Sequence, residues 1–518
     1  MSLKDYHGTL LFSSEAAVLT ELEKELEKPF LKESVIKRKA ICFTTEKNHI
    51  TGLGLYHQGL RHLSESLGNL SHLLYLDLEL NRLISLPESF SQLSHLEHLN
   101  LKLNFHLRSL PKNFGNLVRL KRLNLASNDF TSLPETLGEL VKLQELSLHK
   151  NQLQALPEGF GNLKMLEYLD LSINQLRNLP KSFGNLTNLQ NINISNNQLQ
   201  VLPENFGQLV NLYELNLKNN NLSSLPKSFG NLINLTNLDL STNKLHSLPE
   251  TFGNLLKLKD LSLSNNELVL LPESFGHLAA IQDLKLATNQ ICSLPESFGD
   301  LKLLKKLNLS ANVLVSLPES FGRLSNLQTL ELEENQLHTL PESFGYLCSL
   351  SKLDLSFNKL TSLPKSLGNL KSLEELSLTG NQIKTLPKAF GNLDTLQFLR
   401  VESNILEALP ETFSNLKNLR SLDLTGNQLN ALPETFGRLQ NLGYLDLEVN
   451  KLQSLPDSFG DLLNLKTLIL FDNKLQTLPQ SFKNLKNLIR LNLAENPIAW
   501  SLEDREKLER KIPLVEWG

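Results

Sequence analysis

The sequence contains few of the residues that build disulfide frameworks or metal clusters. It has three cysteines among 518 residues, Cys42, Cys292 and Cys348, and they lie far apart. This number and spacing fit neither a disulfide-stapled protein nor a zinc cluster. We therefore expect a reducing compartment, the cytoplasm, and no bound metal.

Long apolar runs and a strong charge of either sign are also missing. No stretch of about 18 apolar residues occurs, and the N-terminal segment MSLKDYHGTLLFSSE has no apolar core of the kind that directs secretion. We expect neither a membrane span nor export by the ordinary route. The 51 Lys and Arg against 55 Asp and Glu give a net charge of −4. Nucleic acid is not expected as a partner, because phosphate binding needs a basic face.

One pattern dominates what is present, namely a tandem repeat of 23 residues. Eighteen of the 21 prolines occupy one ladder, from Pro87 to Pro111 and then every 23 residues to Pro479. Asparagine follows a parallel ladder of 19 positions from Asn81 to Asn496. The unit reads LxxLxLxxNxLxxLPESFGNLxx, and with a degenerate first copy at residues 53–64 we count 20 repeats. A period of this length predicts a solenoid, in which each unit buries its apolar face on its neighbours.

The strand part of the unit can be followed in one repeat. Leu238 and Leu240 alternate with Asp239, which predicts a short strand with one buried face. Successive repeats then place these strands side by side in a parallel sheet on the concave side of a curved coil. The amide of Asn243 can donate and accept, so we expect it to satisfy backbone groups inside the coil.

The second half of the unit predicts a helical turn on the convex side. Proline, as at Pro249, suits the first position of such a turn, and glycine, as at Gly253, permits a left-handed exit from it. Phenylalanine, as at Phe252, points back into the core. It occupies its position in 16 repeats, with Leu67, Leu137 and Leu367 as substitutes.

At this point the unit resembles the 23-residue leucine-rich repeat of the plant Ras-group proteins and of the animal Ras-pathway leucine-rich scaffold. The resemblance covers roughly residues 50–498 and implies an α/β leucine-rich repeat solenoid, a curved horseshoe that binds proteins and often assembles signalling components. Phenylalanine stands where that family usually has Leu or Ile, and the plant GVYW signature is absent. From the resemblance, a small GTPase or a phosphatase is a candidate partner.

The two ends are predicted to cover the terminal repeats. In the N-terminal cap, residues 1–49, we expect a helix over 14–28 capped by Ser13 or Ser14, followed by a hairpin. We expect residues 50–498 to form the solenoid. We expect residues 499–518 to form a helical C-terminal cap that starts at Ser501 and Asp504. The apolar residues expected to seal the last repeat are Leu502, Leu508, Ile512, Val515 and Trp517.

No motif for catalysis or cofactor binding stands out, so we predict no enzyme activity, no catalytic residues and no cofactor. His72 and His95 share a repeat position and should be neighbours, which allows a metal site, although solvated histidines are the simpler interpretation. Cys292 and Cys348 are expected to be half-buried. The segment 39–43 fits a phosphatase-docking pattern and equally fits a buried cap strand.

Outward-facing strand positions are mostly Asp, Asn or Ser, so apolar residues there indicate candidate binding surfaces. The predicted protein-binding residues are Phe398, Arg400, Tyr444, Val449, Ile469 and Phe471. A weaker second set is Tyr75, Leu80, Leu103, Tyr168 and Ile173. The alternative for the first set is that its members pack on one another beside the C-terminal cap.

These observations favour a non-catalytic scaffold or recognition module that binds proteins in intracellular signalling. Three alternatives stay open. They are an exported adhesion or effector protein, a regulator of an enzyme such as a small GTPase or phosphatase, and a self-associating structural protein.

Overall fold

A computed structural model describes residues 2–37, 39–499 and 501–517 of the chain. The contacts divide the chain into two compact units, Met1–Leu258 and Lys259–Gly518. Both are stacks of the same repeat, in which a three-residue strand alternates with one turn of 3-10 helix.

Unit one begins with a cap and continues with repeats. The cap contains β1 (Leu3–Tyr6), β2 (Thr9–Phe12), α1 (Ser13–Leu26), β3 (Leu31–Lys32), β4 (Ile41–Glu46) and β5 (His49–Leu55). The repeat strands are β6 (Tyr75–Asp77), β7 (His98–Asn100), β8 (Arg122–Asn124), β9 (Glu145–Ser147), β10 (Tyr168–Asp170), β11 (Asn191–Asn193), β12 (Glu214–Asn216) and β13 (Asn237–Asp239). The 3-10 turns are η1 (Glu65–Asn69), η2 (Glu88–Gln92), η3 (Phe114–Asn116), η4 (Glu135–Glu139), η5 (Glu158–Asn162), η6 (Lys181–Asn185), η7 (Glu204–Gln208), η8 (Lys227–Asn231) and η9 (Glu250–Asn254).

Unit two continues the pattern and ends in a second cap. Its strands are β14 (Asp260–Ser262), β15 (Asp283–Lys285), β16 (Lys306–Asn308), β17 (Thr329–Glu331), β18 (Lys352–Asp354), β19 (Glu375–Ser377), β20 (Phe398–Arg400), β21 (Ser421–Asp423), β22 (Tyr444–Asp446), β23 (Thr467–Ile469), β24 (Arg490–Asn492) and β25 (Leu514–Glu516). Its turns are η10 (Glu273–His277), η11 (Glu296–Asp300), η12 (Glu319–Arg323), η13 (Glu342–Tyr346), η14 (Lys365–Asn369), η15 (Lys388–Asn392), η16 (Glu411–Asn415), η17 (Phe436–Arg438), η18 (Asp457–Asp461) and η19 (Gln480–Asn484). The cap helix is α2 (Leu502–Glu509).

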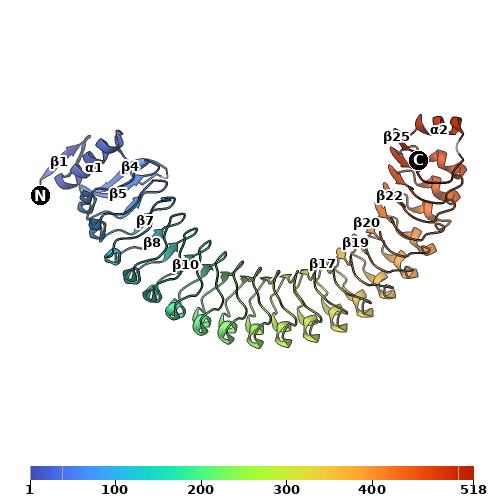
Figure 1. Cartoon of the computed structure of the whole chain (residues 1–518), viewed down its shortest axis with the longest axis horizontal. Helices are drawn as coiled ribbons and strands as arrows, with labels where there is room; N and C mark the ends of the chain where they lie inside the picture. Colours follow the sequence, from blue (N-terminus) through green and yellow to red (C-terminus); the bar gives the residue numbers. More distant parts are fainter. Residues whose placement is uncertain (1, 38, 500, 518) are drawn as a thin grey trace. The chain divides into compact units, whose positions relative to one another are not determined.

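Neighbouring repeat strands pair in parallel with their central leucines in register, as Leu215 does with Leu238 in unit one and Leu284 with Leu307 in unit two. Within each unit the strands line the inner, concave side and the 3-10 turns line the outer, convex side (Figure 1). This confirms the predicted leucine-rich solenoid with a strand-lined face. The helical turns are 3-10 turns of three to five residues.

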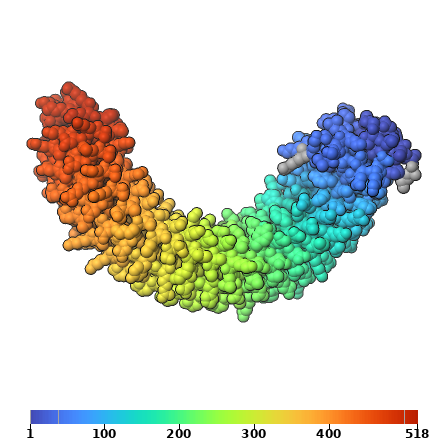
Figure 2. All heavy atoms as spheres, turned by 180° about the vertical axis from the view of Figure 1, so that it is seen from behind, coloured from blue at the N-terminus to red at the C-terminus, as the bar shows by residue number. Residues whose placement is uncertain are grey.

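The core of each unit is a column of fully buried leucines and phenylalanines. Phe183 and Phe206 stack with ring centroids 6.0 Å apart, and Phe298 and Phe321 stack at 6.1 Å. Such stacking stabilises the core in addition to the free energy that each ring gains by burying its apolar area. The space-filling view shows the successive repeats of each unit in continuous contact (Figure 2). No repeat buries its core alone, so stability comes from the interfaces between neighbours.

The asparagine ladder forms as predicted. The Asn243 Nδ2 donates to the carbonyl oxygens of Leu217 and Leu240, each at 3.0 Å, and its Oδ1 accepts from the Leu222 N–H at 3.0 Å. One buried amide thereby satisfies backbone groups of two adjacent repeats. The same arrangement recurs in both units, for example at Asn312.

The predicted roles of the ladder proline and glycine were wrong in detail. Pro249 is the N-cap residue of η9, with an extended ψ of 148°, and it precedes the first helical position. Glycine is needed for space, because a Cβ on Gly299 would lie 2.7 Å from the Ser320 Cβ and still closer to the Ser320 carbonyl oxygen. The left-handed residue of each repeat lies after the strand instead, as at Thr242 with a φ of 57°.

The N-terminal cap contains the expected helix and hairpin. Strands β4 and β5 pair antiparallel through a tight turn at Lys47 and Asn48, both with positive φ. Helix α1 starts after Phe12 without a side-chain cap, so the prediction that Ser13 or Ser14 caps it was wrong. Phe43 is buried on β4, as expected for a cap strand.

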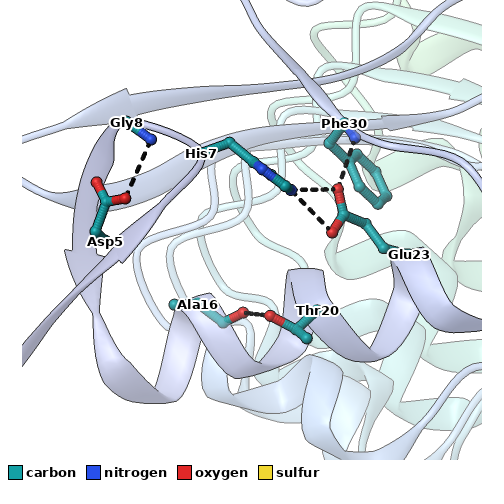
Figure 3. A network of polar contacts seen from close by, with 7 residues as sticks. All are labelled: Asp5, His7, Gly8, Ala16, Thr20, Glu23 and Phe30. Carbon is teal, nitrogen blue, oxygen red and sulfur yellow. Dashed lines mark hydrogen bonds and ion pairs between the residues drawn. The ribbon is translucent and has the colours of Figure 1, made fainter.

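A polar network joins helix α1 to the chain on either side of it. The Glu23 carboxylate binds His7 Nε2 at 3.1 Å and accepts from the Phe30 N–H at 3.1 Å (Figure 3). In the same view, Gly8 N–H donates to Asp5 and Thr20 Oγ1 donates to the Ala16 carbonyl oxygen. Through Glu23, the C-terminal half of the helix is held against the β1–β2 hairpin and the segment before β3.

The C-terminal cap agrees with the sequence only in part. Ser501 caps α2, because its Oγ accepts from the Asp504 N–H at 3.1 Å, and Ile512 is buried. Leu502, however, is 84% exposed, so the prediction that it seals the last repeat was wrong. The seal comes from β25, which pairs in parallel with β24 and extends the sheet by one strand.

Candidate binding surfaces on the strand face

Each repeat presents a fixed set of side chains on the strand face. The first and third strand residues point outward and the second points into the core, as Asn237, Asp239 and buried Leu238 show in β13. Three residues after the strand, the left-handed position presents one more side chain. The first strand position and the left-handed position carry no core packing, whereas the third strand residue is often an Asp or Asn whose Oδ1 accepts from the N–H two residues on, as Asp239 does from Ser241 at 2.9 Å.

The late patch is defined here as Phe398, Arg400, Tyr444, Val449, Ile469 and Phe471. All six residues lie in unit two, on β20, β22 and β23 or on the residues that follow the last two strands. Tyr444, Ile469 and Phe471 are half-buried, and Phe398, Arg400 and Val449 are exposed. Asp446 pairs in register with Ile469, and the Val449 N–H donates to the Phe471 carbonyl oxygen at 2.9 Å. The backbone thus places the members on β22 and β23 next to one another.

Tyr444 is held in place by an acidic neighbour on its own strand. Its hydroxyl donates to Asp446 Oδ2 at 3.0 Å. Burial, followed by the charge and hydrogen bond of Asp446, raises the pKa of Tyr444 well above its usual range. The ring is therefore a neutral, fixed apolar surface at physiological pH.

Carboxylates border the late patch, and we call them the acidic margin: Glu402, Asp423, Asp446, Glu448 and Asp472. Burial, followed by the nearby charges of Asp446, Asp423 and Asp472, raises the pKa of Glu448. Burial, followed by the hydrogen bond with Asp423 and its charge, raises the pKa of Glu402. Negative charges that lie close together on one sheet face disfavour the ionised form of each carboxyl group. A cationic side chain bound beside them would reduce this repulsion.

The substitution Glu448→Gln is expected to stabilise the protein at pH 7 by about 0.5 kcal/mol, a small gain because solvent screens the charges. A carboxyl whose pKa is raised by folding favours the folded state at low pH and opposes it as the pH rises through that pKa. The gain should therefore vanish below the ordinary glutamate pKa of 4.5. Urea unfolding at pH 7 and pH 4 measures it, and an equal gain at both values would contradict the electrostatic explanation.

Val449 occupies the left-handed position of its repeat with a φ of 51°, although it is β-branched. Such side chains rarely adopt positive φ, and the conformation costs on the order of 1–2 kcal/mol. Other repeats carry Asn at this position, at Asn196, Asn219 and Asn265. Val449 is 41% exposed, so little burial offsets the cost within the fold.

We expect Val449→Asn to raise the free energy of unfolding by about 1 kcal/mol, because asparagine tolerates the left-handed conformation. The urea midpoint of the variant against the wild type measures the change. A lower midpoint would mean that the valine packs within the fold, and the late patch would then be cap packing instead of a binding surface.

The early strands of unit one enclose a hollow of about 440 Å³ on the same face. Its lining residues include Tyr75, His98, Arg122, Glu145 and Tyr168. Arg122 Nε lies 3.0 Å from Glu145 Oε1, and the rings of Tyr75 and His98 are 5.9 Å apart. Burial, followed by the Arg122 charge, lowers the pKa of His98, which keeps this imidazole neutral at physiological pH.

The hollow includes only part of the second predicted set. Tyr75 and Tyr168 line it, whereas Leu80, Leu103 and Ile173 lie at the left-handed positions after their strands. Sequence reasoning missed His98, Arg122 and Glu145. The signal was available, since all three are the first residue of their strands.

Three further expectations can be compared with the structure. The rings of His72 and His95 stack at 5.6 Å, so their predicted proximity is confirmed. Cys292 and Cys348 are exposed, so the expectation that they are half-buried was wrong, and Cys42 is buried. Within the described parts of the chain, neither helix has the length and apolar character to cross a bilayer.

Comparison with known proteins identifies the repeat. The family described as "Leucine-rich repeat region" matches residues 107–198, 158–247, 200–307, 296–384 and 352–428, and the "Leucine Rich Repeat" family matches 418–439 and 464–485. Together these matches cover more than half of the chain. No curated protein sequence matches.

Solved structures of similar fold come from several sources. A leucine-rich repeat protein of Leptospira interrogans is 34% identical with a TM-score of 0.59, and the match covers 89% of this chain and 99% of that one. The plant peptide hormone receptor RGFR1, solved in complex with RGF2, is 27% identical with a TM-score of 0.67, over 91% of this chain and 81% of that one. YopM of Yersinia enterocolitica shares the fold at 24% identity and a TM-score of 0.54, over 92% and 93%. The chain belongs to the leucine-rich repeat family, whose members generally act as protein-binding modules.

Proposed function

We propose that this chain is a non-catalytic scaffold that binds a protein partner through the late patch. One observation carries the proposal: the patch puts aromatic and aliphatic side chains, one of them strained, on a sheet face whose outward positions are otherwise mostly polar. Apolar anchors with a polar border are typical of interaction hot spots. A preformed sheet loses little conformational freedom on binding, which favours affinity.

We infer the chemistry of the partner from the charges of this surface. The carboxylates of the acidic margin lie among and beside the apolar residues, so the complementary segment carries apolar anchors together with Lys or Arg. The resemblance to Ras-pathway scaffolds makes a small GTPase or a phosphatase the candidate source of such a segment. All three cysteines are free thiols, which supports a reducing, cytoplasmic setting for this binding.

The double variant Tyr444→Ala, Phe471→Ala tests the proposal. Peptides selected against the wild-type chain from a random library should be rich in basic and aromatic residues. The double variant should bind them at least about 30-fold more weakly, since loss of a hot spot costs roughly 2 kcal/mol or more. Binding is measured by fluorescence anisotropy and folding by thermal melting.

Tyr346→Ala is the matched control, because Tyr346 is an aromatic residue in η13 on the opposite face and is 67% exposed. It should leave binding unchanged. If the double variant melts at a temperature lowered in parallel with its loss of binding, the late patch is structural and the proposal fails.

A further inference from the structure

A buried carboxylate in the N-terminal cap, that of Glu15, makes two polar contacts with strand β5. Glu15 lies in the first turn of α1 and is 2% exposed. Its Oε2 accepts from the Ile50 N–H at 2.6 Å, and its Oε1 lies 2.7 Å from His49 Nδ1. The group therefore joins helix α1 to strand β5.

The His49 ring belongs to a column of four rings. Phe12 stacks on one side at 4.3 Å and His72 on the other at 3.5 Å, and His95 follows His72 at 5.6 Å.

We propose that Glu15, His49 and His72 form a binding site for one zinc ion. The potential ligand atoms of these three residues all lie within 4.8 Å of one another. Two imidazoles and a carboxylate are a donor set that zinc accepts in proteins, with water completing the tetrahedron. The nitrogen donors select against Mg²⁺ and Ca²⁺, which prefer oxygen.

Zinc binding requires one local movement. Stacked rings cannot direct their nitrogen lone pairs to a common point, so the His72 ring must turn out of the column. The exposed His72 can do so, because its bond to Ser71 Oγ is long, at 3.2 Å. His49 and Glu15 then exchange their mutual hydrogen bond for bonds to the ion. The ion would link α1, the hairpin and the turn before β6.

His95 provides the matched control for the test. It is the next ring of the column, but its Nδ1 contacts the Ser71 carbonyl oxygen at 2.9 Å, and it is outside the set of three ligands. Titration calorimetry of the full-length, tag-free chain with Zn²⁺ at pH 7.4 should give saturable binding of one ion. His72→Gln should weaken it at least about tenfold and His95→Gln should not. Mg²⁺ should give no binding.

Two further readouts separate coordination from adsorption. Zn²⁺ should raise the melting temperature of the wild type, and a chelator should reverse the increase, because a ligand of the folded state stabilises it. Co²⁺ in place of Zn²⁺ should give visible absorption bands that disappear in His72→Gln. The proposal is overturned if Zn²⁺ does not bind saturably, or if His72→Gln retains the wild-type affinity. It is also overturned if His95→Gln loses affinity equally.

Discussion

Replacing Gly299 by alanine is expected to lower the free energy of unfolding by about 3 kcal/mol or more. This is the upper end of the usual cost of adding atoms to a close-packed site. The added Cβ would meet the backbone of the next repeat, 2.7 Å from the Ser320 carbonyl carbon and closer to its oxygen. A backbone atom cannot rotate away, so the two repeats must separate. Because stability depends on such interfaces, one methyl group disturbs both neighbours.

Urea unfolding followed by circular dichroism measures this effect. Gly443→Ala is the matched control in the same unit, since its nearest neighbour would be the Arg420 carbonyl oxygen at 3.7 Å. The control should be neutral or slightly stabilising, because alanine restricts the unfolded chain. Equal losses in the two variants would show that the close approach of the repeats does not explain the glycine ladder.

The substitution Asn243→Ala is expected to lower the free energy of unfolding by about 3 kcal/mol. It removes the acceptor of the buried Leu222 N–H and one donor to each of the carbonyl oxygens of Leu217 and Leu240, although the Leu217 oxygen keeps a hydrogen bond from Asn220 Nδ2 at 3.0 Å. A buried N–H left without a partner costs about 1–3 kcal/mol, and the two lost amide hydrogen bonds add to this cost. The change in urea midpoint measures the cost.

Asn237→Ala serves as the control for the asparagine prediction. Asn237 lies six residues earlier in the same repeat, on the exposed first position of β13. Water can replace its contacts, so we expect a change within about 0.5 kcal/mol. A small effect at Asn243 as well would mean that the ladder is dispensable for stability.

Sequence periodicity predicted most of the fold because each repeat position has one environment. Three positions of the repeat are buried as expected, namely those of Leu238, Asn243 and Phe252. The reason for the glycine was missed, because it depends on the neighbouring repeat, and a single unit cannot show it. The left-handed position was missed for a different reason. Residues as unlike as Thr242 and Val449 occupy it, so no residue type marks it.

The ends of the chain were harder to predict because they do not repeat. Strand β25, which pairs with β24, was not expected, and Leu502 is exposed instead of sealing the last repeat. The contact of Glu15 with His49 joins residues 34 positions apart, and nothing in the local pattern connects them. Of the candidate surfaces, the late patch was identified by its apolar outliers. The residues around Arg122 were missed because we searched the outward positions for apolar residues, although the shared first-strand position of His98, Arg122 and Glu145 was visible in the repeat.

Amide hydrogen exchange, with and without a selected peptide bound, tests most directly whether the strand face does the recognising. We predict slower exchange over β20, β22 and β23 in the complex, and unchanged exchange in the outer turn η13 of the same unit. Slower exchange confined to the outer turns, with those three strands unaffected, would contradict the account.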